Sequence, residues 1–501
     1  FSFCQHRCMR LGLLILFAGL LGAQTAAQAE KAKRAKGLMG ERRHAEAAVL
    51  YGELTREIPN NAGLLLNEGM ALHMAGQDAQ AIAPLEAALK LQPGIPPALL
   101  FLGASYLRTG QAAKALSPLE KYAALAPEDL EARQMLADAA TLSGQPVRAI
   151  PHLERLTQAE PRQPALWFLL GRNYEAAAAE SFARLEKLYP ESGPFFALLA
   201  ASRDQASQRR SAFFFYRKAL EKTPAMRGLR TALAAIYRAT GHPEWALHEE
   251  AAEARLGPLD CGVKTPECEF IAKRYRAALQ LSRTGQTANT LYWRTMSYRA
   301  LAAEAFGRLR LLPESVELYR YVAEEHRERG RHAEAAKAWE QALRLAPRDG
   351  DLERELAGAL VAQKDYARSL ELALRLLQAA PGASDLLHLV GEIYLGQQLP
   401  EQARPYLEKS VKADGGNLPA RASLARAYLL EGKADLALPH VTAALPLDTD
   451  GSLHFQLARA WQAAGKPDQA RAALDQYQRI QARIRQQDRV VEEELQITAP
   501  K

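Results

Sequence analysis

The residues whose type and spacing could support chemistry are few, and the clearest are two cysteines, Cys261 and Cys268. Six residues separate them. They are the even pair that remains if Cys4 and Cys8 are removed with an N-terminal signal segment, and in an exported protein such a pair indicates a disulfide, with two free thiols as the alternative. A zinc site would need a second pair of ligands, and none accompanies them. The histidines are scattered, and in the two closest pairs, His242 with His248 and His326 with His332, the members would lie on different faces of a helix. We therefore predict a disulfide and no metal site.

Sequence patterns of common enzymes are also missing. The chain contains no G-x-S-x-G, no G-x-x-x-x-G-K-[ST], no G-x-G-x-x-G and no H-E-x-x-H. Asp448 begins a segment like a calcium loop, but Gly451 stands at its fourth position, and Arg459 stands where a bidentate glutamate is needed. We predict a protein that is not an enzyme and has no cofactor. An enzyme with an unrecognised site in the cysteine segment is the less favoured alternative.

Composition indicates a helical chain. Hydrophobic residues make up 48% of the 501 residues and aromatic residues only 7%. Abundant Ala, Leu, Glu, Arg and Gln with few β-branched residues favour helix over sheet. The net charge is +7, with charges of both signs interspersed. This pattern is not typical of a nucleic-acid-binding surface, so no nucleic-acid partner is predicted.

A period of 34 residues runs through the chain and defines its structural elements. Small residues, alanines, large apolar residues and turn glycines recur with the same spacing as the prolines. The clearest series are Pro59, Pro93, Pro127 and Pro161; Gly69, Gly103, Ala137 and Gly171; and Gly76, Gly110 and Gly144. A small residue lets two helices approach closely, a turn glycine ends the first helix of a hairpin, and proline ends the second.

This pattern resembles the tetratricopeptide repeat over nearly everything after residue 30. The resemblance implies an all-α fold, a right-handed α-solenoid of about twelve helical hairpins with an open concave side. Two units are shortened: Tyr174 to Pro190 and Tyr298 to Pro313 are too short to turn the chain. We expect each of these units to form one long helix, the first from about Leu166 to Leu188.

The predicted domain organisation has five parts. Arg7 and Arg10 precede an apolar run of 11 residues that ends before an A-x-A site at 27–29, so residues 1–29 are predicted to be a signal peptide. Met9 stands in a natural initiator position before Arg10 and the apolar run, and residues 1–8 would then be an extension upstream of the start. The other parts are an N-terminal solenoid (30–258), a cysteine-containing insertion (259–289), a C-terminal solenoid (290–488) and a polar tail (489–501) whose last residues, from Thr498, are expected to fray.

The resemblance also implies where a partner binds, namely at inward positions of the first helix of each hairpin. These candidate groove residues are Leu66, Met70, His73, Leu100, Leu107, Arg320, Glu324, Arg327, His388, Glu392 and Arg426. The groove would be apolar near the N-terminus and charged towards the C-terminus, which suits an extended peptide or a partner helix.

The predicted function is therefore a non-catalytic scaffold or adaptor for a protein or peptide partner of unknown identity. We expect a monomer exported to the periplasm, the cell envelope or the extracellular space, with no stable membrane insertion after signal cleavage. A self-assembling structural spacer of the cell envelope is the alternative from a different class. The polar C-terminal helix argues against it, because stacking would require an apolar terminal face.

Overall fold

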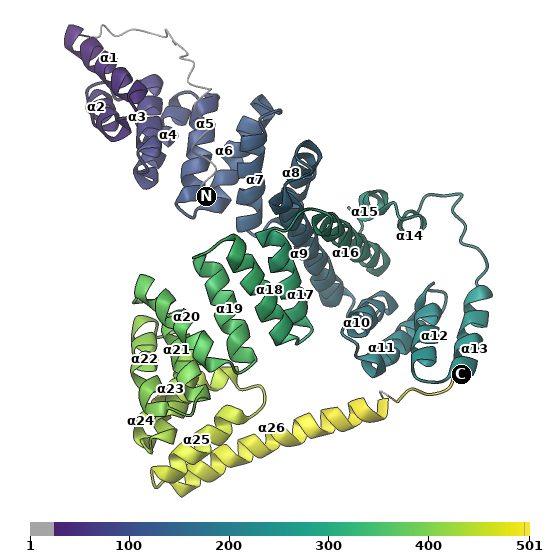
Figure 1. Ribbon diagram of the computed structural model, residues 1–501. Helices are drawn as coiled ribbons and strands as arrows, with labels where there is room; N and C mark the ends of the chain where they lie inside the picture. The colour runs from purple at the N-terminus through teal and green to yellow at the C-terminus, as the bar shows by residue number, and fades with distance from the viewer. Residues whose placement is uncertain (1–24, 495, 501) are drawn as a thin grey trace. The chain divides into compact units, whose positions relative to one another are not determined.

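The computed structural model describes residues 25–494 and 496–500, with side chains described up to residue 485 and again from residue 496. Throughout these ranges the regular structure is helical, and no strand occurs in them (Figure 1). Consecutive helices pack against each other along the chain, as expected for stacked hairpins. The predicted all-α solenoid fold is confirmed.

The chain divides into two compact units, residues 1–177 and 178–501, and the division falls inside α9. The helices up to this division are α1 (Ala26–Gly40), α2 (His44–Glu57), α3 (Ala62–Met74), α4 (Asp78–Leu91), α5 (Pro96–Arg108), α6 (Ala112–Leu125), α7 (Leu130–Leu142), α8 (Pro146–Ala159) and α9 (Pro164–Leu188). The helices that follow are α10 (Gly193–Gln205), α11 (Arg209–Lys222), α12 (Leu229–Ala239), α13 (Pro243–Ala254), α14 (Pro266–Ile271), α15 (Tyr275–Ser282), α16 (Ala288–Arg310), α17 (Val316–Glu328), α18 (His332–Leu345), α19 (Gly350–Ala362), α20 (Tyr366–Ala379), α21 (Ser384–Gly396), α22 (Pro400–Ala413), α23 (Leu418–Leu430), α24 (Ala434–Ala444), the 3₁₀ turn η1 (Leu445–Leu447), α25 (Ser452–Ala463) and α26 (Pro467–Glu494).

The hairpin turns follow from the repeated glycines. After α3 the backbone enters the left-handed region at Gly76 (φ 76°), where a residue without Cβ is unstrained. The amide of Gln77 then donates to the carbonyl of Leu72 at 2.9 Å, which satisfies an acceptor at the helix end. Lys364 and Gln398 form the same left-handed turn without glycine. The glycine series therefore marks most, but not all, of the hairpin turns.

Close approach of the two helices of a hairpin depends on the small residue of the repeat. A Cβ placed on Gly103 of α5 would lie 2.4 Å from Cγ of Leu119 on α6. Gly69 meets Leu85 in the same way. Both leucines are fully buried, so the space that a side chain at glycine would need is already filled.

A second contact links the hairpins and involves a tyrosine of the first helix. The hydroxyl of Tyr174 donates to Glu154 on the preceding helix at 2.6 Å, and that of Tyr428 donates to Glu408 at 2.8 Å. Tyr106 makes the equivalent bond to Glu86, and in all three pairs the residues are 20 positions apart. Each bond gives the polar end of an otherwise packed ring an acceptor, which a buried tyrosine requires.

Both shortened units form long helices, as predicted. α9 spans 25 residues and α16 spans 23, where an ordinary hairpin helix has 13 or 14. The division between the compact units inside α9 differs in position from the predicted end of the N-terminal solenoid at residue 258. Helices on both sides of the insertion, α10 and α16, pack together within the second unit. The five predicted boundaries remain a prediction.

The insertion holds the pair of cysteines in a disulfide, with their Cα atoms 5.7 Å apart. It continues into α14 and α15, which both pack on α16. The buried side chain of Arg294 on α16 donates from Nε to the carbonyl of Ser282 at 3.0 Å and from Nη2 to that of Gly285 at 2.6 Å. These bonds attach the end of the insertion to the long helix.

At its two ends the structure describes part of the predicted signal peptide and part of the predicted tail. Residues 1–24 of the predicted signal peptide lie outside the described residues; Thr25 caps α1, so the A-x-A site at 27–29 stands in its first turn. Among the described helices, none combines the length and apolarity needed to cross a membrane. The expectation that the chain frays from Thr498 is wrong for Thr498 itself, because Tyr237 and Arg217 both bond to it.

Candidate binding surface

The predicted apolar groove positions lie on two neighbouring helices of the first unit. Leu66 and Met70 are on α3, and Leu100 and Leu107 are on α5; all four are partly buried. The first helices α3 and α5 pack directly against each other, although α4 separates them in the chain. The fold therefore places these partly accessible apolar side chains on adjacent helices, as a continuous groove requires.

His73 is held in a polar network at the edge of these positions. Its Nδ1 is 2.6 Å from Oδ1 of Asp78 and 3.0 Å from Oγ of Ser105. The other oxygen of Asp78 is 3.1 Å from Nε of Arg108, and the ring of Phe101 meets the imidazole edge-on at 5.2 Å. His73 thus links α3, α4 and α5, and its role in the structure is first of all to hold the hairpins together. Sequence analysis missed Asp78 and Arg108.

This histidine is expected to make the stability of the first unit depend on pH. Burial lowers the pKa of His73 below its ordinary value of 6.5, while Asp78 opposes this change. The folded state therefore binds this proton less readily than the unfolded state, so stability is full above pH 6.5 and falls as the pH drops below it. Burial also lowers the pKa of His44 and His152 in the same unit.

We expect the free energy of unfolding of this unit to decrease between pH 7.5 and pH 5 by less in the variant His73→Gln than in the wild type. Urea unfolding at the two pH values measures this difference. Because His44 and His152 still titrate, the variant should retain part of the pH dependence. If the variant showed the same pH dependence of the free energy of unfolding as the wild type, His73 would not be a source of that dependence.

Three of the predicted charged groove residues come together in the second unit. Glu392 of α21 lies 3.0 and 2.9 Å, through its two oxygens, from Nη2 of Arg426 on α23. Nε2 of His388 is 3.8 Å from Glu392 and 3.1 Å from Oγ of Ser423, which also donates to Glu392. Ser423 was not predicted, because a serine inside a helical repeat carries no distinctive signal.

Another predicted charge, Arg327, pairs with a residue outside this cluster. Arg327 on α17 pairs with Glu355 on α19, with a nitrogen to oxygen distance of 2.9 Å. Arg320 and Glu324 are partly buried on the same helix α17. These ion pairs therefore join the first helix of one hairpin to the first helix of the next hairpin, α17 to α19 and α21 to α23. The Arg327–Glu355 pair is about half exposed, and such pairs contribute about 0–1 kcal/mol, so a charged partner can compete for them.

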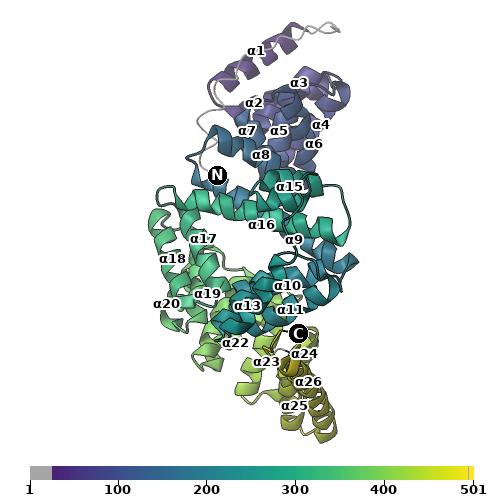
Figure 2. The same cartoon turned by 90° about the vertical axis from the view of Figure 1, so that its right-hand side faces the viewer.

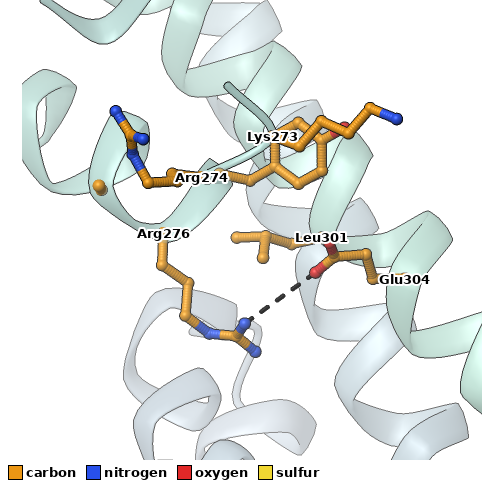
Figure 3. A pocket seen from close by; sticks show the side chains of 7 residues that line it. Lys273, Arg274, Arg276, Leu301 and Glu304 are labelled. Atoms are coloured by element: carbon orange, nitrogen blue, oxygen red, sulfur yellow. Dashed lines mark ion pairs between the residues drawn. The ribbon is translucent and has the colours of Figure 1, made fainter. Parts of the chain in front are cut away.

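A small hollow of about 270 Å³ lies between the insertion and α16 (Figure 3). Two of its three cations already have partners: Arg274 bonds to Glu269 at 2.5 and 3.1 Å, and Arg276 lies 4.0 Å from Glu304, the pair joined by the dashed line. The hollow is slightly smaller than typical small-molecule sites, which start at about 300 Å³. Among the described residues no cluster of three or more His, Cys, Asp or Glu could hold a metal ion.

Comparisons with known proteins agree with the geometry. Family models described as tetratricopeptide repeat match residues 33–96, 106–172, 322–384 and 391–452, which together make up about half of the chain. A comparison with curated proteins gives no match.

Several solved structures are similar over about a third of the chain. MamA of MSR-1 is 25% identical over 34% of this chain and 97% of its own, with a TM-score of 0.30. MamA 41-end from Desulfovibrio magneticus RS-1 is 20% identical over 33% of this chain and 95% of its own, with a TM-score of 0.31. YrrB, described as a TPR protein with an unusual peptide-binding site, is 19% identical over 34% of this chain and 87% of its own, with a TM-score of 0.29. With TM-scores this low, these likenesses carry no argument about function.

Proposed function

This chain belongs to the tetratricopeptide repeat family, and from that premise we propose that it is a non-catalytic scaffold that binds a protein or peptide partner. The main support is the placement of Leu66, Met70, Leu100 and Leu107 on the adjacent helices α3 and α5, where they are only partly buried. An extended peptide or an amphipathic helix can cover such a surface with its own apolar side chains.

We also propose that the charged positions of the second unit contact charged side chains of a partner. Arg426 and Arg327 are both about half exposed while paired with Glu392 and Glu355. A partner segment that carries charged side chains would match these positions of the second unit. A charged group of the partner would replace one member of each ion pair. Such replacement would affect specificity and the association rate more than affinity.

We further propose that the chain is exported and works in the periplasm, the cell envelope or the extracellular space as a monomer. The charged and apolar segments at residues 1–29 and the disulfide of the insertion support this location, because disulfides persist in oxidising compartments. Concentration-dependent assembly in sedimentation experiments would instead favour the structural spacer.

Charged substitutions in the apolar groove are expected to remove binding. The variant Leu66→Glu/Met70→Glu/Leu100→Glu should recover at least tenfold less of the partner than the wild type in a pull-down from an envelope extract, since carboxylates would be placed where apolar contact is needed. The affinity is then measured with the identified partner.

A matched control carries Leu125→Glu and Leu142→Glu, which alter two strongly exposed leucines of the same unit, at 57% and 68% exposure. This control should bind like the wild type, and circular dichroism should show equal helix content in all three proteins. Equal loss in the control, or full binding by the groove variant, would contradict the proposed site.

A further inference from the structure

In one hairpin of the second unit, the tyrosine of the first helix lacks the glutamate partner that Tyr106, Tyr174 and Tyr428 have. Tyr237 on α12 occupies the place of Tyr106, Tyr174 and Tyr428, but the residue 20 positions before it, on α11, is Arg217 and not a glutamate. A guanidinium group has only donors, so it cannot accept a hydrogen bond from the tyrosine hydroxyl. At this hairpin a second donor stands where those three hairpins have an acceptor.

The acceptor for both donors is the segment that follows α26. The hydroxyl of Tyr237 donates to the main-chain carbonyl of Thr498 at 2.8 Å, and Nη1 of Arg217 donates to Oγ1 of Thr498 at 2.7 Å. These partners are 261 and 281 residues apart in the chain. Ile497 packs, partly buried, against a hydrophobic core formed by residues of α9–α13 and α16. In both views residues 496–500, drawn in yellow after α26, lie beside these helices (Figures 1 and 2).

Aromatic rings surround the two donors. The ring of Phe213 meets that of Tyr237 at 5.4 Å, the ring of Trp245 meets it at 5.5 Å, and the guanidinium of Arg217 lies 5.8 Å from the centre of Phe213. Tyr237 is 1% exposed, and burial raises its pKa to about 12, so its hydroxyl stays a donor at neutral pH. This arrangement suits a backbone carbonyl, a side-chain hydroxyl and an adjacent apolar residue.

We propose that Arg217, Tyr237 and the rings of Phe213 and Trp245 form a peptide-binding site for an extended segment with an apolar residue followed by threonine, and that residues 496–500 of this chain occupy the site. The chain's own segment then acts as a tethered competitor, so an external peptide binds only when it displaces this segment. A tether raises the local concentration of a ligand to the order of millimolar, which is enough to keep the site closed to weak peptides.

This site is separate from the groove proposed above. It is built from α11, α12 and α13 of the second unit, whereas the apolar groove positions are on α3 and α5 of the first. Failure of the groove variants to change partner binding therefore has no bearing on the tethered segment, and the reverse also holds.

The test uses the full chain and a fluorescent peptide, Gln-Ile-Thr-Ala-Pro-Lys, which has the sequence of residues 496–501. Fluorescence anisotropy measures its dissociation constant. The variant Ile497→Asp should release the tethered segment and bind the peptide at least tenfold more tightly than the wild type. Adding Arg217→Glu to this variant should remove most of that binding, and adding Tyr237→Phe should weaken it several-fold by loss of one hydrogen bond.

The matched control adds Arg210→Glu, on the same helix α11 and exposed, which should leave peptide binding by the Ile497→Asp variant unchanged. Equal affinity in the wild type and the Ile497→Asp variant would overturn the proposal. Tight binding that survives both Arg217→Glu and Tyr237→Phe would overturn it as well. A wild-type dimer that Ile497→Asp dissociates in sedimentation experiments would assign the segment to a second copy and overturn the tethered arrangement.

Discussion

Replacing Gly103 with alanine is expected to lower the free energy of unfolding of the first unit by about 1–3 kcal/mol, although alanine is the better helix former by about 1 kcal/mol. The added methyl carbon would lie 2.4 Å from Cγ and 2.6 Å from Cδ2 of Leu119. Leu119 is fully buried, so it has no open space to move into. The two helices must separate, and the packing between α5 and α6 loosens.

The control for this prediction is Gly358→Ala on α19, where a Cβ would meet no atom within 4 Å. This substitution should stabilise the second unit by about 0.5–1 kcal/mol, because glycine in the middle of a helix is unfavourable. Thermal or urea unfolding of each variant gives the two values. A stabilising effect at both glycines would show that α5 and α6 do not approach as closely as described.

Leu119 offers a further check on the same contact. Leu119→Ala alone should destabilise by about 2–5 kcal/mol. In the double variant Gly103→Ala/Leu119→Ala the new methyl group occupies part of the space that the leucine leaves. The double variant should therefore be more stable than the sum of the single effects predicts, and simple additivity would contradict direct contact between the two positions.

Replacing Trp339 with alanine is expected to have the largest effect on the second unit, a loss of about 3–5 kcal/mol in the free energy of unfolding. Trp339 on α18 is 1% exposed and lies in a core cluster with Leu352, Leu356 and Leu360 of α19. Its removal leaves a cavity in the contact between successive hairpins. Since repeats are stabilised by their nearest neighbours, hydrogen exchange should accelerate most in α17–α20.

The matched control is Leu345→Ala on the same helix, a side chain that is 47% exposed. Its effect should stay within about 0.5 kcal/mol, as for ordinary surface substitutions. Comparable losses in the two variants would contradict the assignment of Trp339 to the core. Exchange that accelerates equally in every helix would contradict nearest-neighbour stabilisation.

The parts of the molecule that were predicted correctly depend on contacts between residues close in the chain. Gly103 and Leu119 are 16 positions apart, and the turn at Gly76 needs only its immediate neighbours. Such contacts repeat every 34 residues and therefore leave a periodic pattern in residue type. The long helix α9 was also predictable, because no Gly, Pro, Asp or Asn occurs between Glu175 and Tyr189, where an ordinary hairpin would turn.

The groove itself stays a prediction. The fold places Leu66, Met70, Leu100 and Leu107 on neighbouring helices, but the charged positions turned out to be paired with one another or with unpredicted residues such as Ser423 and Glu355. Pairing between first helices depends on the lateral offset of one hairpin against the next. Residue type and spacing along the chain do not encode that offset.

By itself, the sequence determined the helical hairpins, their turns and the two long helices, because each depends on local geometry and on contacts that recur with the repeat. Only the tertiary structure decided where the chain divides into compact units, how His73 and Glu392 find their partners, and that Thr498 meets Arg217 and Tyr237. The last of these contacts joins residues more than 260 positions apart. A contact of that kind occurs once, so it produces no periodic signal, and it forms only after the intervening helices have packed.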